Sequence, residues 1–399
     1  MKIIFVYPFF LPNIGGTEIP MYYFAKELVK RGHEVTIYTN NVIDFKPAKL
    51  KKEEVVDGIL VKRYNFLPLP LAHAFLFSPS IIPELSSIKA DVFHIFAASL
   101  SFIPLASFLA AKIRRIPLVL YPQYYPDRHR YHPALYRRIR NIFVDRVAKV
   151  WIVKKADFVI ALTEKEAEFY RKQGIKNVEV IREPVSLLQS PPQHEIFKVE
   201  SKYKLKEASK ILLFVGRIIK IKGVDVLIRS FSKVLEDFTT AKLLIVGPDQ
   251  GYLSYCQELA QRLKCDKNVI FTGGISDSEL ACLYQLANVV ILPSAYEGYG
   301  RVIIETWSFK KPVITTKTVG LAELVSPKRG ILVDYGDSDA LSKAIIKLLQ
   351  DEDLAKAMGD AGYQLVKKEI TWEKAVDKLE EIYSLICNKR AHPKISNRV

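Results

Sequence analysis

Short apolar runs rich in β-branched residues alternate along the chain with longer segments of helical periodicity. This alternation is typical of parallel βα units, in which a buried strand leads into a crossover helix. The pattern predicts two successive series of strands. The first series covers residues 3–7, 34–38, 92–96, 118–121, 158–161 and 178–181, and the second covers 211–215, 242–246, 269–272, 289–292, 313–316 and 330–333.

Residues 189–208 separate the two series. They contain proline, glutamine and lysine without a strong period, which indicates an inter-domain linker. The sequence therefore predicts an α/β fold with two doubly wound, Rossmann-like domains, over 1–188 and 209–370, followed by a helix over 371–388 and a basic tail over 389–399. Ligands bind such domains at the carboxyl ends of the strands, so we expect the facing loops to form one cleft.

Composition limits the class of protein without changing this fold. The 399 residues are 49% hydrophobic and 26% charged, which are globular proportions. The four cysteines lack CxxC spacing, which argues against a disulfide framework or zinc knuckle and favours a reducing, cytoplasmic setting. Pro8 and Pro12 interrupt the apolar N-terminus, so we predict neither a signal peptide nor a transmembrane segment.

The net charge of +16 is concentrated in residues 112–155. This segment contains 12 Lys and Arg, interleaved with aromatic residues, and only two Asp. Such a segment attracts anionic partners, although a solvated basic helix is the simpler interpretation. Together with the apolar residues 66–82, it predicts a wedge suited to an anionic membrane surface, so peripheral association with the inner membrane face is a further option. No nucleic-acid partner is expected, because no recognised module is present.

Three loops that follow predicted strands carry candidate binding residues. Gly15 and Gly16 precede a helix predicted over 19–31, where backbone amides suit a phosphate. Arg217 and Lys222 lie five residues apart in a strand-to-helix loop, and two cations there can neutralise a diphosphate leaving group.

The most specific segment is Pro293-Ser-Ala-Tyr-Glu297-Gly298-Tyr299-Gly300-Arg-Val-Ile-Ile-Glu305. It supplies backbone amides in a glycine-containing loop and then begins a helix. Glu297 and Glu305 are eight residues apart and can contact two ends of one ligand. A carboxylate can accept both hydroxyl groups of a ribose, whereas helix N-terminal charge is the structural alternative for Glu305.

Over nearly its whole length the chain resembles the retaining, nucleotide-sugar-dependent glycosyltransferases of family 4, which have the GT-B fold. The residues that carry the resemblance are Gly15-Gly16, the 31–36 run, Asp91 to His94, Gly216-Arg217, Lys222-Gly223, Ile245 to Gly247, Phe271 to Gly273, Pro293-Ser294, the Glu297 and Glu305 pair, Pro312 to Ile314, and Gly320 to Glu323.

The resemblance implies a role for each candidate. Arg217 and Lys222 would bind the donor diphosphate and Glu305 the ribose, and Glu297 with Gly298, Tyr299 and Gly300 would bind the transferred sugar and the phosphates. Gly15 and Gly16 would close over the diphosphate, and backbone near 274–276 would meet the base. The implied partners are a UDP- or GDP-sugar donor and a lipid-linked or saccharide acceptor, with no metal and no other cofactor.

The chain departs from the family pattern on the acceptor side. Gln123 stands where the family usually has a sugar-contacting histidine, and it can form hydrogen bonds but cannot titrate. His94-Ile-Phe96 replaces the usual His-x-His. The alternative function is therefore a catalytically impaired nucleotide-sugar-binding protein.

A double displacement through paired carboxylates remains the competing mechanism, and it needs a nucleophile on the opposite face of the sugar.

Overall fold

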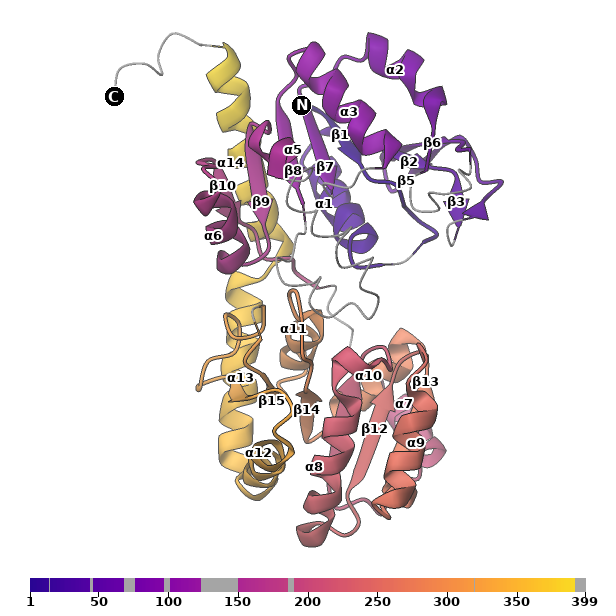
Figure 1. The fold of residues 1–399 in the computed structure, drawn as a ribbon, viewed down its shortest axis with the longest axis vertical. Coiled ribbons are helices and arrows are strands. Elements are labelled where there is room, and N and C mark those ends of the chain that lie inside the picture. The colour runs from indigo at the N-terminus through magenta and orange to yellow at the C-terminus, as the bar shows by residue number, and fades with distance from the viewer. Residues whose placement is uncertain are drawn as a thin grey trace. The chain divides into compact units, whose positions relative to one another are not determined.

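The computed structural model describes residues 1–13, 15–43, 46–67, 76–96, 101–122, 150–185, 190–318 and 320–391. It contains two compact units, which we call unit 1 (Met1–Pro184 with Thr371–Val399) and unit 2 (Val185–Ile370). Each unit has a parallel-stranded sheet with helices on both faces (Figure 1). The predicted α/β fold with two doubly wound, Rossmann-like domains is confirmed.

Unit 1 has an eight-stranded sheet of order β10-β9-β8-β7-β1-β2-β6-β5. The strands are β1 (Lys2–Val6), β2 (Glu34–Asn40), β5 (Glu53–Val56), β6 (Ile59–Tyr64), β7 (Val92–Phe96), β8 (Leu118–Tyr121), β9 (Phe158–Ala161) and β10 (Val178–Val180). The short strands β3 (Val42–Ile43) and β4 (Lys46–Pro47) pair with each other in a separate sheet.

The hairpin of β5 and β6 was not predicted, although its turn has a clear sequence signal. Asp57 and Gly58 adopt φ angles of +50° and +80°, as a type I′ turn requires, and Asp-Gly is a preferred pair for that turn. β5 pairs antiparallel with β6 and so ends the sheet.

Helices cover both faces of the unit 1 sheet. Apolar side chains of α2 (Ile82–Ser87), α3 (Phe102–Ile113), α5 (Val150–Lys154) and α6 (Glu164–Lys172) share one core with alternate residues of the strands. On the opposite face, α1 (Glu18–Lys30) packs against α14 (Trp372–Ala391), where Trp372 stacks on Tyr23 with ring centroids 5.1 Å apart.

Polar contacts also hold α14 on unit 1. Arg31 donates hydrogen bonds to Asp377 at 2.7 Å and to Glu380 at 2.5 Å, and Nε2 of His33 lies 2.6 Å from the same Glu380 carboxylate. Although burial opposes it, these contacts keep the pKa of Glu380 below its ordinary value. Part of the 31–36 run that resembles the family therefore anchors the C-terminal helix.

Unit 2 has a six-stranded parallel sheet of order β13-β12-β11-β14-β15-β16. Its strands are β11 (Ile211–Val215), β12 (Lys242–Val246), β13 (Val269–Gly273), β14 (Val289–Leu292), β15 (Val313–Thr316) and β16 (Gly330–Val333). One face packs against α8 (Val224–Asp237), α9 (Leu253–Arg262) and α12 (Ser338–Gln350), and the other packs against α7 (Gln193–Lys202) and α10 (Asp277–Leu286). The remaining helices are α11 (Arg301–Ser308) and α13 (Glu352–Glu369).

The linker predicted over 189–208 is in part a helix. Within it, α7 buries Ile196 and Val199 in the core of unit 2, while Phe197 remains exposed. Two buried apolar positions in a ten-residue helix make a weak pattern, which explains why the sequence suggested a linker. The predicted tail over 389–399 begins inside α14, and its residues 392–399 lie outside the described residues.

Among the described residues, none of the helices is both long and apolar enough to span a membrane. Cys256, Cys265, Cys282 and Cys387 are all free thiols.

Candidate functional site

The predicted binding residues of unit 2 lie in loops at the carboxyl ends of its parallel strands, except Glu305, which lies in the helix α11 that follows one of these loops. The loop after β11 and the loop after β14 are joined by a hydrogen bond from the Ala295 amide to the Ile221 carbonyl at 2.8 Å. The loop after β12 bonds to the loop after β11, since the Ile218 amide donates to the Pro248 carbonyl at 2.9 Å. These bonds fix the loops with respect to one another, and the side chains they carry are thereby held in place.

Two glycines permit the close approach of these loops. Gly223 adopts a φ of +68°, and a Cβ atom there would lie 2.1 Å from the carbonyl oxygen of Pro293. At Gly320, a Cβ atom would lie 2.0 Å from the carbonyl oxygen of Gly298. A larger residue at either position would force the loop after β14 away from its neighbours.

Lys222 and Glu297 form an ion pair across the two joined loops. The ammonium group of Lys222 donates a hydrogen bond to Oε2 of Glu297, and Ser294 Oγ lies 3.4 Å from the same oxygen. The side chains of Lys222 and Glu297 are only 16% and 20% exposed, so this pair is partly shielded from water. The structure thus brings together a cation and a carboxylate 75 residues apart in sequence.

Arg217 lies in the same loop as Lys222 but is exposed. Its Nη1 donates a hydrogen bond to the side-chain oxygen of Gln250 at 3.1 Å. Gln250 follows Asp249, whose carboxylate accepts hydrogen bonds from the amides of Gly251, Tyr252 and Leu253. The loop after β12 thereby supplies a side chain that orients Arg217, a role we did not predict from the sequence.

Glu305 lies in α11 and accepts a hydrogen bond from the hydroxyl of Tyr284 in α10 at 2.8 Å. Burial raises the pKa of Glu305, and so does the nearby Asp277, whereas the Tyr284 hydrogen bond and the positive charge of Arg301 oppose the rise. The bond to Tyr284 fixes one carboxylate oxygen, Oε2. Tyr284 was missed, because an apolar helix face gives no sign of which tyrosine hydroxyl meets a carboxylate.

Gly298, Tyr299 and Gly300 connect Glu297 to the start of α11. Gly300 precedes the helix with a φ of +79°, and Tyr299 is buried. Since the first amides of a helix lack intrahelical partners, the start of α11 offers donors to an anionic or hydroxylated ligand.

Gly15 and Gly16 lie in unit 1 between β1 and α1. A Cβ atom on Gly15 would lie 2.5 Å from the carboxylate of Glu18, whereas nothing lies within 4 Å of one on Gly16. Burial raises the pKa of Glu18, although backbone hydrogen bonds oppose the shift. The predicted glycine loop is therefore next to a buried carboxyl group that we did not single out from the sequence.

Gln123, the acceptor-side candidate, lies outside the described residues. Nearby, Tyr121 donates a hydrogen bond to the buried Glu183 at 2.7 Å. His94 is fully buried, and desolvation lowers its pKa to about 3. It packs between Phe5, Phe96 and Tyr383, so His94 and Phe96 belong to the core of unit 1.

The predicted apolar wedge over 66–82 is partly core where it is described. Phe66, Leu76 and Ile81 are buried, whereas Leu67 and Ile82 are exposed. Residues 68–75, and residues 123–149 of the basic segment, lie outside the described residues. The wedge prediction is wrong at these buried positions. Phe66 and Leu76 pack with Val42 and Phe9, and Ile81 belongs to the core that the strands share with α2.

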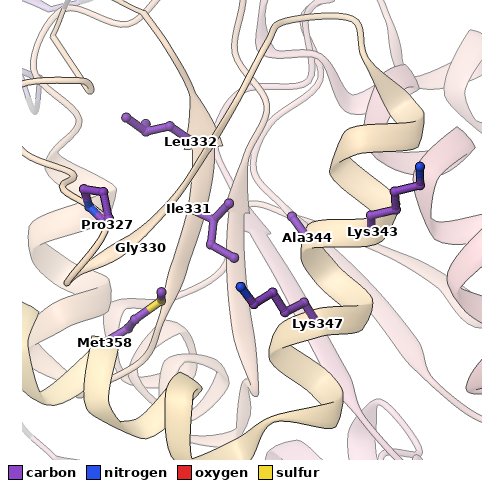
Figure 2. A pocket seen from close by; sticks show the side chains of 8 residues that line it. All are labelled: Pro327, Gly330, Ile331, Leu332, Lys343, Ala344, Lys347 and Met358. Carbon is purple, nitrogen blue, oxygen red and sulfur yellow. The ribbon is translucent and has the colours of Figure 1, made fainter.

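A hollow of about 450 Å³ lies elsewhere in unit 2, between β16, α12 and α13 (Figure 2). It is lined by Pro327, Gly330, Ile331, Leu332, Lys343, Ala344, Lys347 and Met358. None of the predicted site residues lines it, and no carboxylate does. It is therefore distinct from the loops at the carboxyl ends of the strands.

Acidic clusters do not form a metal centre among the described residues, where no group of three or more His, Cys, Asp or Glu is placed to hold an ion. Two Asp-x-Asp sequences, Asp337-Ser-Asp339 and Asp351-Glu-Asp353, have a pattern that can hold a metal, but here each begins a helix. Asp337 accepts hydrogen bonds from the amides of Asp339 and Ala340 at the start of α12, and Asp351 accepts one from the Leu354 amide at the start of α13. Helix capping explains these residues.

Comparison with known proteins shows that two family models match this chain. The family model described as "Glycosyltransferase Family 4" matches residues 14–187, and the one described as "Glycosyl transferases group 1" matches residues 195–365. The first match begins after β1 and contains the other strands of the first series, and the second contains the second series of strands and all the candidate residues of unit 2.

Two relatives and one solved structure illustrate the likeness. The capsular polysaccharide biosynthesis glycosyltransferase CapM of Staphylococcus aureus is 32% identical over 189 residues, a match that spans 47% of this chain and about half (49%) of CapM. N-acetyl-alpha-D-glucosaminyl L-malate synthase of Bacillus anthracis is 24% identical over 93% of this chain and 94% of that protein. The structure of Anabaena HepE in complex with UDP and glucose superimposes with a TM-score of 0.74, at 19% identity, over 96% of this chain and all of that chain.

Proposed function

Because the chain belongs to the glycosyltransferases of family 4 and group 1, with the GT-B fold, we propose that it is a retaining hexosyltransferase. It moves a hexose from a UDP- or GDP-sugar to a hydroxyl group of a lipid-linked or other cell-envelope glycan acceptor. The observation that carries the proposal is the placement of Lys222, Glu297 and Glu305 in joined loops and the helix that follows them, at the carboxyl ends of parallel strands. HepE, a protein of the same fold, was crystallised with UDP and glucose, which supports a nucleotide-sugar donor.

Each side chain has a defined part in the proposed reaction. Lys222 and Arg217 stabilise the negative charge of the departing diphosphate, together with amides of the loop 298–300. Glu305 accepts hydrogen bonds from the ribose hydroxyls through the oxygen that Tyr284 leaves available. Glu297 accepts hydrogen bonds from the hexose.

The proposed chemistry is a transfer on one face of the sugar. The bond from the anomeric carbon to the diphosphate oxygen breaks, and a bond to the acceptor oxygen forms on the same face. The leaving phosphate takes the acceptor proton, so the protein need not supply a titrating base and Gln123 can serve by hydrogen bonding alone. In this proposal Arg217 and Lys222 supply the positive charge, and no metal cofactor is required.

Calorimetric titration tests donor binding. The purified protein is titrated with UDP, GDP and their glucose, mannose and N-acetylglucosamine conjugates, with and without EDTA. We expect micromolar binding to the conjugates of one base, unaffected by EDTA. Lys222→Ala and Glu305→Gln should abolish it, whereas Lys210→Ala, which removes a lysine paired with Glu352 at the amino end of β11, should not. Absence of binding to every compound would contradict the proposal, and binding without transfer to any glycan acceptor would favour the impaired alternative.

We further propose that unit 1 contacts an anionic membrane surface through α3. Leu109 and Ile113 are 48% and 81% exposed on this helix, and Arg114 and Arg115 directly follow it. An exposed apolar pair beside cations suits an anionic interface.

Vesicle flotation at low salt tests this contact. We expect binding to vesicles that contain anionic lipid, little binding to neutral vesicles, and loss of binding in Ile113→Asp. The matched control is Val55→Asp, which changes an exposed apolar residue of β5 that is 68% exposed. If both variants bind anionic vesicles as the wild type does, α3 is not the contact surface.

A further inference from the structure

The ion pair between Lys222 and Glu297 joins two side chains to which the proposed function gives different ligands. Lys222 is assigned to the diphosphate and Glu297 to the hexose, yet in the structure the Lys222 ammonium donates to the Glu297 carboxylate. With only 16% and 20% of the two side chains exposed, water screens the pair poorly. A diphosphate that approaches Lys222 therefore meets a carboxylate already bound there.

A hydrogen bond and a close packing contact hold the two loops together. The Ala295 amide is bonded to the Ile221 carbonyl at 2.8 Å, one residue before Lys222 and two residues before Glu297. Gly223 packs so closely on the Pro293 carbonyl that no side chain fits between them. The carboxylate thus stays within reach of Lys222, and only side-chain rotation can separate the charges.

A nucleotide sugar and a bare nucleoside diphosphate affect Glu297 differently. An intact donor brings hexose hydroxyl groups, which can donate hydrogen bonds to the carboxylate and replace the ammonium. A nucleoside diphosphate brings only negative charge, so Glu297 loses its Lys222 donor, keeps the long 3.4 Å hydrogen bond from Ser294 Oγ, and lies next to an anion. Leaving a partly buried carboxylate in this condition is unfavourable.

We propose that Glu297 acts as a product-release group: it binds hexose hydroxyls while the donor is intact, and after transfer it competes with the nucleoside diphosphate for Lys222. This inference rests on the proposed function and deepens it. The carboxylate discriminates against the product, because the sugar that satisfied it has left with the acceptor. Ser294, with Oγ 3.4 Å from Oε2 of Glu297, lies beside the carboxylate while it is paired with Lys222.

The test compares Glu297→Gln with the wild type in calorimetric titrations with UDP and GDP and with their hexose conjugates. The amide keeps the size of the side chain but not its charge. We expect the dissociation constant for the preferred nucleoside diphosphate to fall at least about fivefold in Glu297→Gln, the lower range for coupled sites. Affinity for the intact conjugate should stay the same or fall, product inhibition should strengthen, and kcat should decrease.

Two further variants make the test specific. Glu352→Gln removes a carboxylate that contacts Lys210 at 2.5 Å at the opposite end of β11, and it should leave both affinities unchanged. Glu297→Asp keeps the charge but shortens the reach to Lys222, so its affinity for the nucleoside diphosphate should lie between those of the wild type and Glu297→Gln. This series remains informative even if one substitution impairs folding.

The outcomes separate this inference from the proposed function. If the wild type binds neither UDP nor GDP nor any conjugate, the proposed function fails. If the wild type binds them but Glu297→Gln binds the nucleoside diphosphate no more tightly, the product-release role is wrong and the donor site stands. Equal tightening in Glu352→Gln would also overturn the inference, because the effect would then be one of overall charge.

Discussion

Protonation of His94 should make the structure of unit 1 sensitive to acid. The imidazole is fully buried among Phe5, Phe96, Tyr121 and Tyr383, and its Nδ1 lies 2.6 Å from the Tyr383 hydroxyl. Its Nε2 has no hydrogen-bond partner among the described residues. A positive charge there would lie buried among aromatic rings, and burial is why the pKa falls from 6.5 to about 3.

The size of this pH effect on stability follows from the difference in the number of protons bound by the folded and the unfolded chain. Between about pH 6.5 and pH 3 the unfolded chain protonates this histidine and the folded protein does not, so stability is lost as the pH falls through this window. One proton changes the free energy of unfolding by about 1.4 kcal/mol per pH unit. From about pH 6.5 to pH 5 the His94 contribution is therefore a loss of about 2 kcal/mol, a sizeable share of a typical stability of about 5–15 kcal/mol.

His94→Asn isolates this contribution, because asparagine keeps a polar group near Tyr383 but cannot titrate. Urea unfolding followed by circular dichroism at several pH values should show that stability falls less steeply in the variant, by about 1.4 kcal/mol per pH unit. Tyr383→Phe is the control, since it removes the hydrogen bond and keeps the imidazole, and it should retain the steep dependence. Parallel curves for the wild type and His94→Asn would refute the reasoning.

Three further substitutions test particular contacts. Tyr284→Phe removes the hydrogen bond that fixes Glu305, so nucleotide affinity should fall about tenfold, and calorimetry across pH should show binding lost at a higher pH than in the wild type. Gly223→Ala adds a Cβ atom at 2.1 Å from the Pro293 carbonyl oxygen at a positive φ, and thermal unfolding should show a loss of about 2–4 kcal/mol. Its control is Gly251→Ala, with a φ of +88° and open space around it, which should cost only about 1 kcal/mol. Trp372→Ala removes the ring stacked on Tyr23 and should destabilise unit 1 by about 3 kcal/mol while hydrogen exchange in unit 2 stays unchanged.

The sequence predicted those features that depend on local pattern. Continuous apolar runs identified the buried parallel strands. Gly223 and Gly320, which carried the family resemblance, lie where loops approach one another closely. The missed β5–β6 hairpin had a local signal as well, in Asp57-Gly58. These features are predictable because a few neighbouring residues determine the backbone conformation.

Features that depend on contacts between distant residues could not be predicted from the sequence. No pattern shows that Tyr284 meets Glu305, that Gln250 orients Arg217, or that Lys222 is paired with Glu297. Whether a side chain is buried also depends on residues that are distant in the sequence. α7 was mistaken for a linker because few of its side chains enter the core of unit 2, and Phe66 was placed in a membrane wedge although the core of unit 1 encloses it.

The order in which the chain leaves the ribosome has a consequence for unit 1, which combines two separate stretches, Met1–Pro184 and Thr371–Val399. Unit 2 is one continuous stretch between them, so all its strands are available before α14 is synthesised. Unit 1 instead has to wait for α14, because Tyr383 and Trp372 cover His94, Tyr23 and Phe24 only after that helix has been made. During translation the N-terminal half therefore exposes an aromatic face to solvent and chaperones, and a chain that stops before α14 leaves that face open to aggregation and proteolysis.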